Sequence, residues 1–140
     1  MKPSLAGLSK FDYFGVLLLR IGAGALAVFH GFPILTGGSD AWTDIGSGIA
    51  ITTLSPSFFL AAGIASAIIQ VFGGLFLLIG LFTRGAALFL TLVAGFGLAN
   101  AIAQGDYFSL NAFALLHVTL VYFSIAFIGP GRLSVDRKGV

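Results

Sequence analysis

Four long apolar runs alternate with short polar segments along this chain. The first, residues 11–35, reads FDYFGVLLLRIGAGALAVFHGFPIL, and from residue 14 onward its ionisable groups are Arg20 and His30. A helix of about 20 apolar residues is long enough to cross a bilayer. The pattern therefore predicts four membrane-spanning helices, over residues 12–35, 56–81, 86–104 and 110–128.

Glycine, proline and serine mark the ends of these helices. Ser55 followed by Pro56 is typical of a helix start, and Ser109 can cap the last helix. The GPG sequence at residues 129–131 ends that helix, and a polar tail follows over residues 130–140. Residues 40–54 are polar enough to leave the membrane, and Thr83, Arg84 and Gly85 are expected to form a tight turn between the second and third helices. We expect one domain, a compact antiparallel four-helix bundle over residues 1–140.

Composition supports a membrane protein. Of the 140 residues 58% are hydrophobic and 9% are charged, and the mean hydropathy is +1.07. Soluble domains average roughly 25% charged residues. Cysteine is absent, which excludes disulfides, thiolate catalysis and cysteine-ligated clusters, and no metal site is expected. The basic residues are scattered, so a nucleic-acid partner is not expected.

Charge distribution predicts the orientation. The basic residues before the first helix, between the second and third, and after the fourth are Lys2, Lys10, Arg84, Arg132, Arg137 and Lys138. The other two loops carry Asp40, Asp44 and Asp106 and no basic residue. Because basic loops stay on the cytoplasmic side, both termini are expected in the cytoplasm.

Three helices carry a polar side chain at similar depth. From a rise of 1.5 Å per residue, Arg20, Gln70 and His117 lie roughly 13, 16 and 18 Å from the cytoplasmic face. One interpretation is that Arg20 and Gln70 hydrogen-bond each other and nearby carbonyls to fix the bundle. A second is a polar pocket that binds a carbonyl compound or a small anion, since charged groups inside membranes usually mark sites. A third is a buried contact with another subunit.

A second polar layer, nearer the outer face, contains His30, Asn100 and Gln104. Asn100 and Gln104 are four residues apart and share one side of their helix. These residues are interpreted as interfacial in preference to ligand-binding. His30 and His117 differ in depth by roughly 10 Å, so a shared b-type haem is not expected.

Three sequence segments together resemble the DoxX family of small four-helix membrane proteins. They are LLLRIGAGALAVFHGFPIL, QVFGGLFLLIGLFTRGAAL and, after the last helix, GPGRLSVD. By position, the resemblance carries over the family's helix-one arginine to Arg20 and its His-Gly to His30 and Gly31. The other matched positions are Thr83, Arg84, Gly129, Gly131, Arg132, Ser134 and Asp136.

The resemblance implies a multi-pass protein of a prokaryotic cytoplasmic membrane. The family includes the membrane subunit of a thiosulfate:quinone oxidoreductase, which makes quinone a candidate ligand, whereas no intrinsic cofactor is expected. Relatives often carry glutamate where this chain has Gln70, so a proton-transfer role of that carboxylate would not transfer. His30-Gly31 is also followed by Phe32 and Pro33 in place of the more usual polar and basic residues.

Two functions therefore stay open at this point. The first is a membrane subunit of an oxidoreductase that binds a quinone head group or small anion near Arg20, Gln70 and His117, with electrons supplied by a partner or a substrate. The alternative is a non-catalytic accessory subunit of a larger electron-transfer complex. In both cases the expected surroundings are the lipid bilayer and partner subunits or further copies of the chain. A transporter is less well supported, because no charged pathway is evident.

Overall fold

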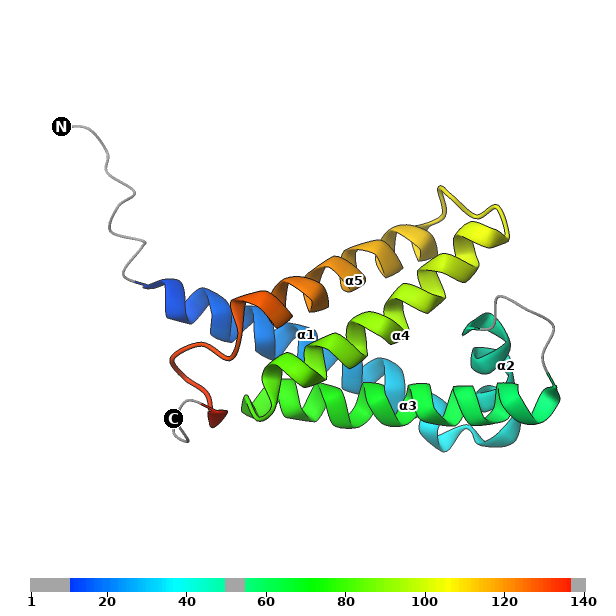
Figure 1. The fold of residues 1–140 in the computed structure, drawn as a ribbon, viewed down its shortest axis with the longest axis horizontal. Helices are drawn as coiled ribbons and strands as arrows, with labels where there is room; N and C mark the ends of the chain where they lie inside the picture. Colours follow the sequence, from blue (N-terminus) through cyan, green and yellow to red (C-terminus); the bar gives the residue numbers. More distant parts are fainter. Residues whose placement is uncertain (1–10, 50–54, 137–140) are drawn as a thin grey trace.

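The computed structural model describes residues 11–49 and 55–136, and within these ranges the regular structure is helical (Figure 1). The helices are α1 (Asp12–Thr36), α2 (Gly38–Ile49), α3 (Pro56–Ile79), α4 (Thr83–Ala103) and α5 (Leu110–Ile128). The last helix has the bounds that the sequence predicts. Its first turn is capped as expected, because the Ser109 hydroxyl accepts a hydrogen bond from the Ala112 N–H at 3.0 Å.

Four of these helices are long and apolar enough to cross a membrane. They are α1, α3, α4 and α5, with mean hydropathies between 1.7 and 2.2 over their most apolar windows. Their outward faces carry many exposed phenylalanine and leucine side chains, which suit a bilayer and not water. The chain is therefore a multi-pass membrane protein.

Helix α2 differs from the sequence-based prediction. Its residues fall where a polar segment outside the membrane was expected, yet they form a 12-residue helix directly after α1. The expected break does occur, with Gly38 at a φ of +78°. Helix α2 packs on α3 at Gly46 and Gly63, where the two backbones leave no room for a β-carbon on either side. The described part of the chain thus has five helices, one more than predicted.

The connection between α3 and α4 comes earlier than predicted. Helix α3 ends at Ile79, and Gly80 takes the left-handed conformation, with its N–H bonded to the Phe76 carbonyl at 2.9 Å. Helix α4 begins at Thr83. The residues expected to form the turn therefore make the first turn of α4, and the turn itself occupies residues 80–82. The turn depends on Gly80, which lies three residues before the Thr-Arg-Gly sequence and has a positive φ.

Helices α1 and α3 approach each other closely through glycine. A β-carbon on Gly74 would lie 2.6 Å from the Gly24 carbonyl oxygen, and one on Gly24 would lie 2.7 Å from the Gly74 oxygen. Such close approach through small residues is typical of helix packing in membranes. The surrounding core is built mainly from alanine and leucine; its buried members are Ala23, Ala27, Leu77, Ala86, Ala87, Leu90, Ala94, Tyr122, Ile125 and Ala126.

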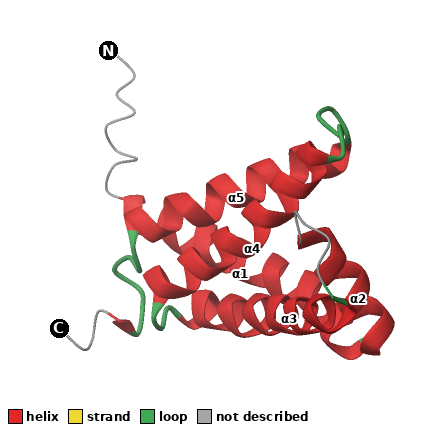
Figure 2. Ribbon diagram, turned by 45° about the vertical axis from the view of Figure 1, so that its right-hand side comes forward, coloured by secondary structure: helices red, strands yellow, loops and turns green. Residues whose placement is uncertain are grey.

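Helices α4 and α5 form a second packed pair (Figures 1 and 2). The pair lies close to α1 and α3 at the end of the molecule where α5 finishes, and diverges from them toward the end that carries α2 (Figure 1). This divergence leaves room between the two groups of helices for the cavity described next.

Candidate functional site

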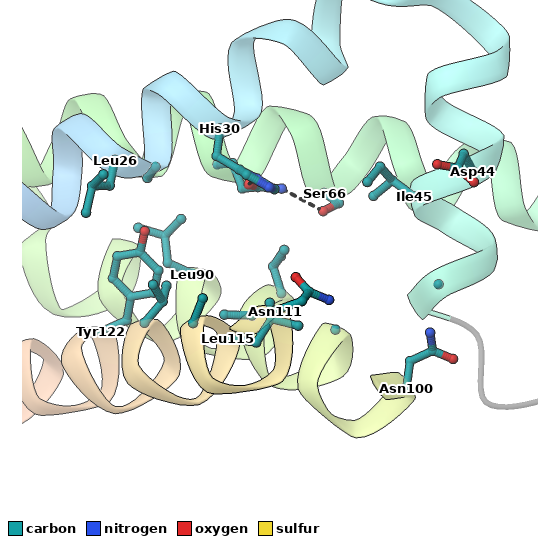
Figure 3. Close-up of a pocket in the computed structure, with 18 residues that line it drawn as sticks. Leu26, His30, Asp44, Ile45, Ser66, Leu90, Asn100, Asn111, Leu115 and Tyr122 are labelled. Atoms are coloured by element: carbon teal, nitrogen blue, oxygen red, sulfur yellow. Dashed lines mark hydrogen bonds between the residues drawn. The ribbon is translucent and has the colours of Figure 1, made fainter. Parts of the chain in front are cut away.

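All five helices line a cavity of about 480 Å³ between the two helix pairs (Figure 3). Its size lies within the range of small-molecule sites, about 300–1,000 Å³. Its lining residues are Leu26, Ala27, His30, Asp44, Ile45, Gly48, Ser66, Gln70, Leu90, Val93, Ala94, Gly97, Asn100, Asn111, Ala114, Leu115, Val118 and Tyr122. Most of the wall is apolar, and a few polar groups converge on one part of it. Such a wall suits an apolar molecule with a polar head.

A chain of three polar side chains forms part of the wall. The Nδ1 atom of His30, on α1, lies 2.6 Å from Oε1 of Gln70, on α3. Gln70 in turn donates from Nε2 to the Ser66 hydroxyl at 3.1 Å. Because Ser66 and Gln70 are four residues apart, both project from the same face of α3. Gln70 and Ser66 are buried, while His30 reaches from α1 into the cavity (Figure 3).

Gly31 allows this chain to form. A β-carbon at this position would lie 2.6 Å from the β-carbon of Gln70 and 3.1 Å from the backbone nitrogen of Val71. The absence of a side chain lets α1 lie directly against α3 and brings the preceding His30 within hydrogen-bond distance of Gln70. The His-Gly pair is therefore explained by packing next to the cavity.

Further polar side chains come from α2, α4 and α5. Asp44, Asn100 and Asn111 lie away from the end of the cavity formed by Leu26 and Tyr122 (Figure 3). The Tyr122 hydroxyl is buried and donates to the Ala23 carbonyl at 3.4 Å. The cavity thus has an apolar end with one tyrosine and a more polar remainder that α2 partly covers.

Arg20 lies outside this cavity. Its guanidinium donates to the backbone carbonyls of Pro130 and Leu133, the latter at 2.7 Å, and the side chain is 2% exposed. A β-carbon on Gly80 would lie 2.8 Å from the Arg20 guanidinium carbon. The side chain therefore reaches toward the end of the helices, as long basic side chains do in membranes. Arg20 holds the C-terminal tail against the turn between α3 and α4.

Asp136 fixes the same tail to the start of α4. Its carboxylate accepts hydrogen bonds from the backbone N–H groups of Phe82 at 2.7 Å and Thr83 at 2.8 Å. Its own N–H donates to the Gly80 carbonyl at 2.9 Å. Burial acts to raise the pKa of the Asp136 carboxyl, but the hydrogen bonds from Thr83 and Phe82 and the charge of Arg20 hold it below its usual value. We call this set of contacts between residues 130–136, Arg20 and the turn the tail clasp.

The remaining motif positions belong to the clasp or its edge. Ser134 donates to the Gly131 carbonyl at 3.0 Å, and the guanidinium of Arg84 lies beside Gly129. Arg132 is exposed. The fold thus brings these family-motif residues together at one end of the molecule, away from the cavity.

The structure separates the three residues that were grouped by depth. Gln70 lines the cavity, whereas Arg20 belongs to the tail clasp. His117 is exposed on α5, with Nδ1 2.6 Å from the Phe113 carbonyl one turn earlier. Counting residues along a helix gives the depth of the backbone but not the side of the helix or the reach of the side chain. For this reason the three side chains do not meet, although their backbones lie at similar depth.

The outer polar layer is divided in the same way. His30 and Asn100 line the cavity, and Gln104 is an exposed residue after the end of α4. Sequence reasoning missed Ser66, Asp44, Asn111 and Tyr122 as lining residues. The four-residue spacing of Ser66 and Gln70 was an available signal. In residues 11–49 and 55–136, no group of three His, Cys, Asp or Glu side chains could hold a metal ion.

A comparison with protein-family models shows to which family this chain belongs. The model of the DoxX family matches residues 15–97, which is more than half of the chain. This chain belongs to the DoxX family. No curated protein and no solved structure matched it. In this DoxX protein the matched segment contains Arg20 and the complete chain of His30, Gln70 and Ser66, whereas the tail that Arg20 binds lies after it.

Proposed function

We propose that this DoxX protein is a membrane subunit of an oxidoreductase system that binds a quinone head group in the five-helix cavity. The observation that carries the proposal is the hydrogen-bonded chain of His30, Gln70 and Ser66 in a cavity whose wall is otherwise mainly apolar. A quinone ring has apolar faces and two oxygen atoms, so it needs this combination of surfaces. Histidine can also exchange protons near neutral pH, which quinone chemistry requires.

Charge favours a neutral head group over a small anion. None of the described residues that line the cavity is lysine or arginine, and Asp44 contributes a carboxylate. Arg20, which sequence analysis associated with an anion, has its guanidinium committed to two backbone carbonyls in the tail clasp. An anion in the cavity would therefore lack a fixed positive partner and face a negative one.

The proposed orientation places both termini in the cytoplasm of a prokaryotic cell, with the protein in its cytoplasmic membrane. Arg84 and Arg132 then lie on the inner side and Asp106 on the outer side, in agreement with the positive-inside rule. The chain has no cysteine, so a single Tyr107→Cys variant provides a unique label site. Labelling of intact cells by a membrane-impermeant maleimide supports this orientation; labelling only after cell disruption contradicts it.

Native mass spectrometry of protein released gently from its own membrane tests the proposed function. We expect an added mass matching a quinone on the wild-type protein, its loss in His30→Ala, and its retention in His117→Ala. The second variant is a matched control, because His117 is an exposed histidine outside the cavity. The comparison requires that the two variants have the same melting temperature and the same yield.

Two results would contradict the proposal. Equal retention of the quinone by His30→Ala would place its site elsewhere. Release together with larger subunits and without any small-molecule adduct favours the accessory function, in which the protein stabilises a larger complex.

A further inference from the structure

The orientation of the His30–Gln70 hydrogen bond determines which nitrogen of a neutral His30 ring carries the proton. Gln70 donates from Nε2 to Ser66, so its Oε1 atom faces His30. An amide oxygen can only accept a hydrogen bond. In the neutral imidazole the proton must therefore sit on Nδ1, and Nε2 carries a lone pair. Gln70 acts as a positioning residue that fixes the tautomer of His30.

The nitrogen left for a ligand is consequently an acceptor. Asp44, the carboxylic acid that lines the cavity, also only accepts when ionised. The Tyr122 hydroxyl directs its hydrogen to the Ala23 carbonyl, which leaves its oxygen as an acceptor. Asn100, Asn111 and the Ser66 hydroxyl can each donate or accept, so they favour neither form of the ligand.

From this arrangement, and resting on the function proposed above, we propose that the cavity selects the reduced, hydroxyl-bearing form of its ligand, a hydroquinone, over the oxidised quinone. A hydroquinone hydroxyl donates to Nε2 of His30. A quinone carbonyl brings a second lone pair against the first, so it makes no hydrogen bond with this nitrogen. The difference corresponds to about a tenfold preference for one directed hydrogen bond.

The test uses the full-length protein in nanodiscs with a short-chain benzoquinone and its hydroquinone as probes. Dissociation constants for both forms are measured under anaerobic conditions at neutral pH. We expect the wild-type protein to bind the hydroquinone about tenfold more tightly. Equal constants, or tighter binding of the quinone, overturn this inference while leaving quinone binding itself intact. Failure to bind either form contradicts the proposed function as well, so the two failures are distinguishable.

Gln70→Glu provides a readout that a merely structural role of Gln70 would not produce. A carboxylate beside Nδ1 stabilises the protonated imidazole, which places a hydrogen on Nε2 and turns it into a donor. We expect the preference for the hydroquinone to be lost, because a donor at Nε2 can pair with a quinone carbonyl as well as with a hydroxyl oxygen. Gln104→Glu is the matched control, since Gln104 is exposed and does not line the cavity. A Gln70→Glu protein that binds both forms with the wild-type ratio overturns the positioning role.

The tautomer can be observed without any ligand. Nitrogen-15 NMR of histidine-labelled protein distinguishes a protonated Nδ1 from a protonated Nε2 in a neutral ring, and His117→Gln leaves His30 as the single remaining histidine. A neutral His30 with its proton on Nδ1 supports the inference. A proton on Nε2 overturns it, even if Gln70→Glu fails to fold.

Discussion

The Asp136 carboxylate lies 2.8 Å from the backbone N–H of Thr83, the first residue of α4, although 53 residues separate them in the chain. Backbone N–H groups at the start of a helix have no partner within the helix. Asp136 satisfies two of them, at Phe82 and Thr83, and its negative charge faces the positive end of the helix. The C-terminal tail thus supplies the N-terminal cap that the α3–α4 turn lacks.

Replacing Asp136 with alanine should lower the free energy of unfolding by about 1–2 kcal/mol, because it removes a helix cap and a charge at the helix end. Since the folded protein holds the pKa of Asp136 below its usual value of 3.8, this contribution is complete above that value. It is lost as pH falls from about 3.8 through the lower pKa of the folded state. The measurement is thermal unfolding in detergent at several pH values.

The controls for this experiment come from the same tail. Arg132→Gln removes an exposed charge and should change stability by less than about 0.5 kcal/mol. Asp136→Asn should remain insensitive to pH over the acidic range in which the wild-type protein weakens. If wild type and Asp136→Asn lose stability in parallel below pH 4, other carboxylates cause the acid response.

Arg20→Gln should destabilise the protein by about 2–4 kcal/mol, because charge-assisted hydrogen bonds to Pro130 and Leu133 are lost in a buried position. Ligand binding should persist in the folded fraction, since Arg20 does not line the cavity. Melting temperature and quinone retention, measured on the same sample, separate the two effects. A variant that melts at the wild-type temperature but loses its ligand would show that Arg20 takes part in ligand binding.

Gly74→Ala should cost about 1–3 kcal/mol, because the added carbon meets the Gly24 carbonyl oxygen and the helices must separate to admit it. Gly22→Ala is the control: it lies on the same pair of helices, in α1, and its β-carbon would enter open space. Alanine also favours helix over glycine, so that variant should be neutral or stabilising. Equal melting temperatures for the two variants would show that the α1–α3 contact is looser than described.

The long helices could be predicted from the sequence, and α2 could not. Runs such as residues 110–128 are apolar along their whole length, so the bilayer requirement alone defines them. Helix α2 contains glycine at positions 38, 46 and 48, which normally disfavours a helix. It forms because Gly46 and Gly63 let it pack against α3, a contact between distant residues that no local pattern reports.

This cavity was not predicted from the sequence. Sequence analysis singled out His30, Asn100 and Gln70, which line it, but it interpreted His30 and Asn100 as interfacial residues and grouped Gln70 with Arg20 and His117. It assigned Gln70 to Arg20, because both were placed by the depth of their backbones. Gln70 instead contacts His30, and the long side chain of Arg20 extends to the tail. Side-chain direction around a helix axis, which depth along the axis does not contain, decides these partners.

The tail clasp also has a consequence for biosynthesis. Arg20 precedes its acceptor Pro130 by 110 residues, so the ribosome makes the cation roughly 5–20 s before its partner. During that interval the first helix carries a charge whose placement in the membrane costs about 2.5–3.5 kcal/mol. The contacts of Arg20 with Pro130 and Leu133 can form only after residues 130–136 have been made, when Asp136 also caps the start of α4. Insertion of the first helix alone therefore cannot place the Arg20 side chain as the folded protein holds it.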